Sequence, residues 1–124
     1  MNQIVNSSKP MLKNLNESEY QKILKKVPDP LTEEFLVFIK ENNQVILDTT
    51  CWIIIRNCKY DGDTTHLTMF SKEAAKDTKD LSAESLLEMA QIFSCHRDKL
   101  IFLNKKEKRS IPDRLHFHLA DQYI

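Results

Sequence analysis

The stretch Arg114-Leu115-His116-Phe117-His118-Leu119 alternates polar and apolar residues along its whole length. Successive side chains of a β-strand point to opposite faces. We therefore expect the apolar residues to face the core and Arg114, His116 and His118 to share the other face. A guanidinium and two imidazoles on one face can bind an anion such as phosphate. Alternatively, two imidazoles can bind a metal ion, or one can act as a nucleophile while its neighbour manages protons. A solvated strand face without function would show the same alternation.

Four segments before this stretch are rich in the β-branched, aromatic and other apolar residues that are typical of strands. They cover residues 45–47, 51–56, 66–70 and 100–103. The first two are expected to form a hairpin around Asp48-Thr49-Thr50. Ser82 is expected to cap a helix between the third and fourth segments. The apolar residues at helical spacing in this helix are Leu86, Met89, Ala90 and Phe93.

Two further helices are expected ahead of the first strand. Asn16 and Glu19 have the spacing of a capping box in front of apolar residues at helical spacing. The segment Pro28–Pro30 ends that helix. Thr32 is expected to cap the second helix, which carries acidic residues in its first turn and ends near Asn42.

The order of these elements predicts an α+β fold with a five-stranded antiparallel sheet and a long helix, preceded by two extra N-terminal helices. Residues 1–44 are interpreted as an N-terminal tail and helical extension, and residues 45–124 as the sheet domain. The two parts are expected to form one compact unit, because 124 residues suit a single domain.

Composition excludes several classes of function. Eighteen Lys and Arg balance eighteen Asp and Glu, so no overall field favours nucleic acid or membranes. The single glycine excludes the glycine-rich phosphate loops of nucleotide-binding proteins. No stretch approaches the roughly 18 apolar residues of a membrane span, and the polar N-terminus does not resemble a secretory signal. Cys51, Cys58 and Cys95 lack CxxC spacing, which favours reduced thiols and a cytoplasmic location.

His66 opens the third predicted strand and is expected to lie beside the last one. Three histidines, His66, His116 and His118, would then converge, as in three-imidazole zinc centres. His96 is expected at the C-terminal end of the Ser82 helix, where an imidazolium favours the helix dipole, and is interpreted as structural.

Residues 45–122 resemble the histidine triad (HIT) superfamily of nucleotide hydrolases and transferases. The likeness rests on short motifs in the family's order: residues 46–52 for an early hairpin, 66–73 for a strand that opens with histidine, 80–84 for the start of the long helix, 102–104 for a strand ending in asparagine, and 110–119 for the serine motif and the triad. The resemblance implies a HIT-like fold, no cofactor and no metal ion.

Several positions depart from the family pattern. Arg114 stands where the first triad histidine is expected, and one extra residue separates the serine motif from the triad. The family's glycine-bearing loop is replaced by the charged run 105–109, and the histidine expected within 73–75 is absent.

The resemblance assigns roles to six residues. His116 would attack the α-phosphorus of a nucleotide derivative and form a covalent nucleotidyl-imidazole intermediate, and His118 would contact the phosphate or leaving group and help with protons. Asn104, Ser110 and His66 would bind or assist the substrate. Arg114 would add a permanently charged fork of donors for phosphate.

The expected ligand is a nucleotide or a dinucleoside polyphosphate, with a nucleic-acid end as a further candidate for the charged run 105–109. Homodimers are common in the family and are a candidate assembly here. The alternatives are a non-catalytic HIT-like nucleotide-binding module and the three-histidine metal site.

Overall fold

The computed structural model describes residues 18, 22, 25–56, 66–105, 109, 111 and 113–121. It contains an antiparallel sheet with the strand order β1-β2-β3-β5-β4. The strands are β1 (Val45–Asp48), β2 (Trp52–Arg56), β3 (Leu67–Ser71), β4 (Leu100–Phe102) and β5 (His116–Ala120). The predicted α+β class and five-stranded antiparallel sheet are therefore confirmed.

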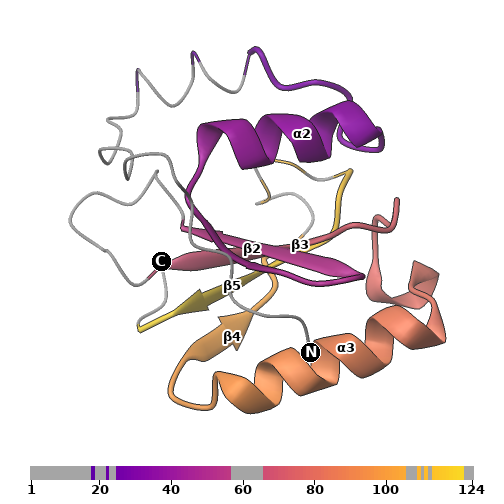
Figure 1. Ribbon diagram of the computed structural model, residues 1–124, viewed down its shortest axis with the longest axis vertical. Helices are drawn as coiled ribbons and strands as arrows, with labels where there is room; N and C mark the ends of the chain where they lie inside the picture. Colours follow the sequence, from indigo (N-terminus) through magenta and orange to yellow (C-terminus); the bar gives the residue numbers. More distant parts are fainter. Residues whose placement is uncertain are drawn as a thin grey trace.

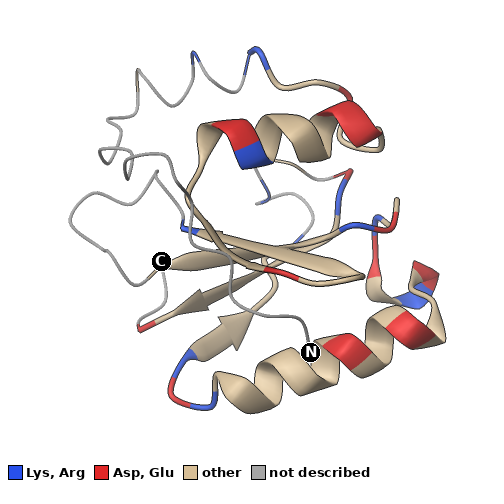
Figure 2. Cartoon of the chain, in the orientation of Figure 1, with Lys and Arg blue, Asp and Glu red and all other residues tan. Residues whose placement is uncertain are grey.

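Two helices cover opposite faces of this sheet, α2 (Glu33–Asn42) and α3 (Ala83–Cys95) (Figure 1). A short 3-10 turn, η1 (Thr78–Asp80), precedes α3. Within the described strands only Asp48 and Arg56 are charged, and most charged residues of the described ranges lie on helices, turns and loops (Figure 2). The central strands β2 and β5 are buried along their whole length.

Each face of the sheet has its own apolar core. On one face, Leu115, Phe117 and Leu119 pack with Trp52 and with Ile92 of α3. On the other, Phe35, Leu36 and Ile39 of α2 pack with Ile53 and Phe70. An irregularity in the pairing of β1 and β2 divides Val45 and Leu47 between the two cores, although they stand two residues apart.

The hairpin between β1 and β2 is tied to α3 by Glu88. Its carboxylate accepts hydrogen bonds from the Thr49 hydroxyl and from the Cys51 N–H, the latter at 2.8 Å. The Trp52 indole N–H donates to the Ser85 carbonyl at 2.9 Å. These bonds set which side of α3 faces the sheet.

The prediction of the buried face of α3 is wrong: the observed buried face is rotated about the helix axis by part of a turn. Ile92 is fully buried and Ser85 nearly so, whereas Leu86 is 40% exposed and Leu87 is 64% exposed. Ala90 is also exposed. Met89 and Phe93 do pack against the core, as expected. Ser82 caps this helix, and its hydroxyl accepts from the Ser85 N–H at 3.2 Å.

Thr32 stands at the N-cap position of α2, but its side chain does not cap the helix. Its hydroxyl donates to the Asp29 carbonyl at 2.7 Å instead, because the chain turns there before the helix starts. The helix expected after Asn16 lies outside the described residues, apart from isolated positions. No helix in the described ranges is long and apolar enough to cross a membrane.

Candidate functional site

Three histidines meet at the junction of β3 and β5, on the face of the sheet that also carries α2. Pairing of these strands sets Thr68 opposite His118 and Phe70 opposite His116. His66 directly precedes β3 and is fully buried. Its Nε2 atom lies 3.0 Å from Nδ1 of His118, so the expectation that His66 lies beside the last strand is met.

Asn104 extends this contact into a chain of hydrogen bonds. Its amide nitrogen lies 3.3 Å from Nε2 of His118. An amide nitrogen only donates, so Nε2 of His118 accepts and His118 carries its proton on Nδ1. That proton is donated to Nε2 of His66. Asn104, His118 and His66 therefore form one hydrogen-bonded chain that fixes the orientation of the His118 ring.

His116 is held separately. Its Nδ1 atom lies 3.0 Å from the backbone carbonyl oxygen of Arg114, and because a carbonyl oxygen only accepts, the proton sits on Nδ1. Nε2 therefore carries the lone pair, and no residue in the described part of the chain bonds to it. Burial lowers the pKa of His116, the Arg114 carbonyl opposes this, and the cation of Arg109 lowers the pKa further. The ring is consequently neutral at pH 7.

Aromatic rings hold the two imidazoles of β5. The ring of Phe102 stacks on His118 with centroids 5.2 Å apart, and the ring of Phe70 lies 5.0 Å from that of His116. The two imidazole centroids are 5.4 Å apart. Both histidines are 5% exposed, so this part of β5 is not the solvated face that the alternation also allowed.

The structure does not support the expectation that Arg114 offers its guanidinium to a phosphate. Arg114 is 1% exposed, and its nitrogens donate only to backbone carbonyls among the described residues. The acceptors belong to Pro30, Thr32, Ser71, Lys72 and Glu73. The Thr32 and Glu73 carbonyls also accept from the backbone N–H groups of Phe35 and Ala75. The guanidinium therefore ties these two segments to Arg114 through their carbonyls.

A scan against models of known protein families finds no match for this sequence, and a search among curated proteins likewise finds none.

Of the remaining residues predicted to belong to the site or to the charged run, the structure describes some and not others. Ser110 and residues 106–108 of the charged run lie outside the described residues. Arg109 lies against the site, and its Nε–H donates to the Asn104 carbonyl at 2.8 Å. From the sequence, Arg109 is expected in the charged run 105–109, either as part of a solvated hairpin tip or as a contact for a phosphate-rich ligand. The link to Asn104 was not predicted, because the acceptor is a backbone carbonyl, which has no sequence signature.

The three histidines do not form a metal site of the expected kind. No group of three His, Cys, Asp or Glu side chains suited to a metal ion occurs in the ranges that the structure describes. Nε2 of His66 and both ring nitrogens of His118 are already used, since His66 and His118 bond to one another and His118 bonds to Asn104. The three-histidine zinc alternative is not supported by this geometry.

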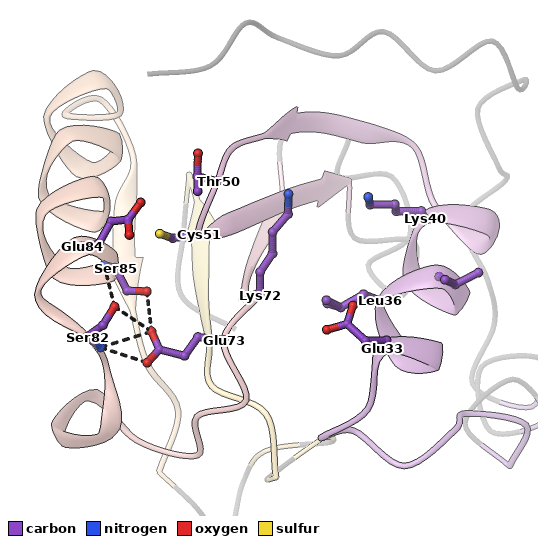
Figure 3. A pocket seen from close by; sticks show the side chains of 11 residues that line it. Glu33, Leu36, Lys40, Thr50, Cys51, Lys72, Glu73, Ser82, Glu84 and Ser85 are labelled. Atoms are coloured by element: carbon purple, nitrogen blue, oxygen red, sulfur yellow. Dashed lines mark hydrogen bonds between the residues drawn. The ribbon is translucent and has the colours of Figure 1, made fainter.

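A cleft of about 510 Å³ opens elsewhere, between α2 and the N-terminal end of α3 (Figure 3). None of the three clustered histidines, Arg114 or Asn104 lines it. Several of its polar groups are engaged within the protein: Lys40 and Lys72 pair with Asp48, and Glu73 accepts from Ser82 and Ser85 at the start of α3.

Cys51 lines this cleft, and its surroundings disfavour the thiolate form. It is 8% exposed, and burial raises its pKa, as do the carboxylates of Glu88, Glu84 and Glu73. A raised pKa removes the thiolate that nucleophilic chemistry requires.

Proposed function

We propose that this protein is a HIT-like nucleotide hydrolase or nucleotidyl transferase that acts at an α-phosphate through a covalent intermediate on His116. The observation that carries the proposal is the hydrogen bond from His116 Nδ1 to the Arg114 carbonyl, at 3.0 Å. It leaves the lone pair on Nε2, and burial keeps the ring neutral. A neutral imidazole with a fixed lone pair is a competent nucleophile and needs no separate base.

The reaction would proceed in two displacements. Nε2 forms a bond to the α-phosphorus, and the bond from phosphorus to the leaving group breaks, with the electron pair going to the leaving group. The imidazole becomes positively charged in this step, and the Arg114 carbonyl stabilises the charge by accepting the Nδ1–H bond. Water or another acceptor then forms its own bond to phosphorus, and the phosphorus–nitrogen bond breaks to return the pair to Nε2. The water proton passes to solvent or to the departed group.

His118 and Asn104 would serve the phosphate side of the site. His118 stands next to His116 on the same face of β5, and the chain from Asn104 through His118 to His66 fixes its ring. In this proposal the substrate is a nucleoside phosphoramidate or a dinucleoside polyphosphate, as the family resemblance implies. In this proposal Arg114 stabilises the fold and does not bind the substrate.

The experiment is to trap the intermediate. Purified protein is incubated with a panel of nucleoside phosphoramidates and dinucleoside polyphosphates, quenched in alkali, and measured by intact mass spectrometry, because phosphorus–nitrogen bonds survive alkali. We expect a nucleoside monophosphate adduct on the wild type and none on His116→Ala. His96→Ala is the matched control, since His96 caps the far end of α3 and its ring bonds to the Ile92 carbonyl. Turnover retained by His116→Ala would contradict the mechanism.

A non-catalytic nucleotide-binding module is the second candidate, and the Arg114 contacts favour it. An arginine wholly committed to backbone carbonyls cannot exchange a proton as a triad histidine can. Nucleotide binding by calorimetry, with no adduct and no turnover across the panel, would support this second function over the first.

A further inference from the structure

We infer that Arg114 is a positioning residue for His116, acting through its own backbone carbonyl. This inference rests on the proposed function where it concerns turnover, but the geometry it describes is independent of any activity.

The guanidinium joins two segments that are far from β5 in the sequence. Nη1 donates to the carbonyls of Ser71, Lys72 and Glu73 at 2.9, 3.2 and 3.2 Å, which gathers the turn after β3 around one nitrogen. Nη2 donates to the Thr32 carbonyl at 3.2 Å, and Nε donates to the Pro30 carbonyl, so the start of α2 is tied to the same side chain.

The ring of Phe35 supports the guanidinium from one side. The central carbon of Arg114 lies 5.5 Å from the ring centroid, within the range of a cation–π contact. Only a planar guanidinium, with N–H donors in several directions, can donate to carbonyls of both segments at once. A lysine keeps the charge but has a single compact head, so it cannot reproduce this set.

The backbone next to Arg114 is fixed as well. The Leu115 N–H donates to the Ala75 carbonyl at 2.8 Å, and the Leu115 carbonyl accepts from the Ser71 N–H at 3.1 Å. Side chain and backbone together hold the Arg114 peptide in one orientation. Its carbonyl oxygen is the acceptor for His116 Nδ1, so the guanidinium, together with the Leu115 N–H bond, sets which nitrogen of His116 carries the proton.

The test reads the tautomer of His116 directly. The chain has four histidines, and ¹⁵N-histidine labelling with a His116→Gln comparison assigns the signals of His116. In the wild type we expect Nδ1–H with Nε2 unprotonated. A wild-type His116 that is protonated on Nε2 would overturn the inference without any variant, so the test does not depend on whether a mutant folds.

Arg114→Lys is the informative variant, and Arg109→Lys is its matched control. Arg109 is also an arginine that bonds to carbonyls, those of Asn104 and Lys76, but it does not bond to His116. We expect Arg114→Lys to mix the two tautomers and to lower kcat about tenfold or more with KM unchanged, the scale seen when an orienting partner is removed. Arg109→Lys should leave the tautomer intact.

The opposite pattern would refute the inference. If Arg114→Lys raises KM, leaves kcat unchanged and keeps the Nδ1–H tautomer, Arg114 contacts substrate and does not position His116. If the wild type shows no turnover on any substrate, the proposed function fails. The tautomer measurement still decides the role of Arg114 in that case.

Discussion

Replacing Ile92 by alanine tests which side of α3 faces the sheet. Ile92 is 0% exposed and packs against the core that holds Trp52 and Phe117, whereas Leu86 is 40% exposed and Leu87 is 64% exposed on the same helix. Removing a fully buried isoleucine side chain costs about 2–5 kcal/mol, from lost transfer free energy and from the cavity. Alanine returns a few tenths of a kcal/mol through its higher helix propensity. We therefore expect Ile92→Ala to lower the free energy of unfolding by about 3 kcal/mol.

Alanine substitutions at Leu86 and Leu87 of α3 provide the stability changes with which Ile92→Ala is compared. Burying a whole leucine side chain is worth about 1.5–3 kcal/mol, so the partly exposed Leu86 should cost about 1 kcal/mol when replaced by alanine. Leu87→Ala should change the stability by no more than about 0.5 kcal/mol, as for most surface positions. The face predicted from the sequence requires the reverse order, with Leu86→Ala costing more than Ile92→Ala.

Urea denaturation followed by the fluorescence of Trp52 suits this test. Trp52 is fully buried and its indole bonds to the Ser85 carbonyl of α3, so its emission reports the packing of the helix on the sheet. With a slope of about 1.5 kcal/mol/M, a loss of about 3 kcal/mol moves the midpoint down by about 2 M. Equal midpoints for Ile92→Ala and Leu86→Ala would refute the packing described above.

Two further predictions concern stability. Ser82→Ala removes the hydroxyl that caps α3 and should lower the free energy of unfolding by about 1 kcal/mol, measured by the same denaturation; no change would show that Glu73 alone caps the helix. Stability should also fall as the pH drops below about 6.5, the ordinary pKa of histidine. Burial lowers the pKa of His116 in the folded protein, so the unfolded chain binds more protons at this residue. The contribution of His116 to the free energy of unfolding is therefore present above the unfolded pKa. It is lost as the pH falls through the folded pKa. Midpoints measured across this range in His116→Gln should lose that part of the dependence. The lowered pKa values of Asp48 and Glu73 act in the same direction, but only in the range of carboxyl titration.

The sheet was predictable from the sequence because its signals are local. Alternation in 114–119 and β-branched residues in 51–56 identify strands without knowledge of their neighbours. Strand order then brings His66 to His118, since an antiparallel partner of β5 must begin where β5 ends. The side of α3 was not predictable in the same way. Two apolar stripes fit its spacing, and the buried one includes Ser85 and Glu88. Ser85 bonds to Trp52 at the start of β2, and Glu88 bonds to Thr49 and Cys51 in the hairpin.

The contacts of the Arg114 side chain could not be predicted from the sequence, for a related reason. Its acceptors are backbone carbonyls between 41 and 84 residues away, and a carbonyl has no sequence signature. A strand pattern places the side chain on the correct face but gives no indication that residues 30–32 and 71–73 close over that face. The imidazoles of His116 and His118 are buried as well, although the alternating pattern alone also allows them to face solvent.

The two arginines beside His116 act by different physical means, and this difference can be measured. The cation that lowers the pKa of His116 is Arg109, after the larger effect of burial, whereas Arg114 reaches His116 through a carbonyl hydrogen bond that opposes the lowering. Arg109→Gln removes the charge, so the pKa of His116 should rise towards its ordinary value. Arg109→Lys keeps the charge and should leave that pKa in place. Titration of the His116 ring by NMR compares the three proteins. A pKa that is unchanged or lower in Arg109→Gln would show that the field of Arg109 does not reach the imidazole. A rise of equal size in Arg109→Lys would assign the effect to the bond from Arg109 to Asn104 and not to charge.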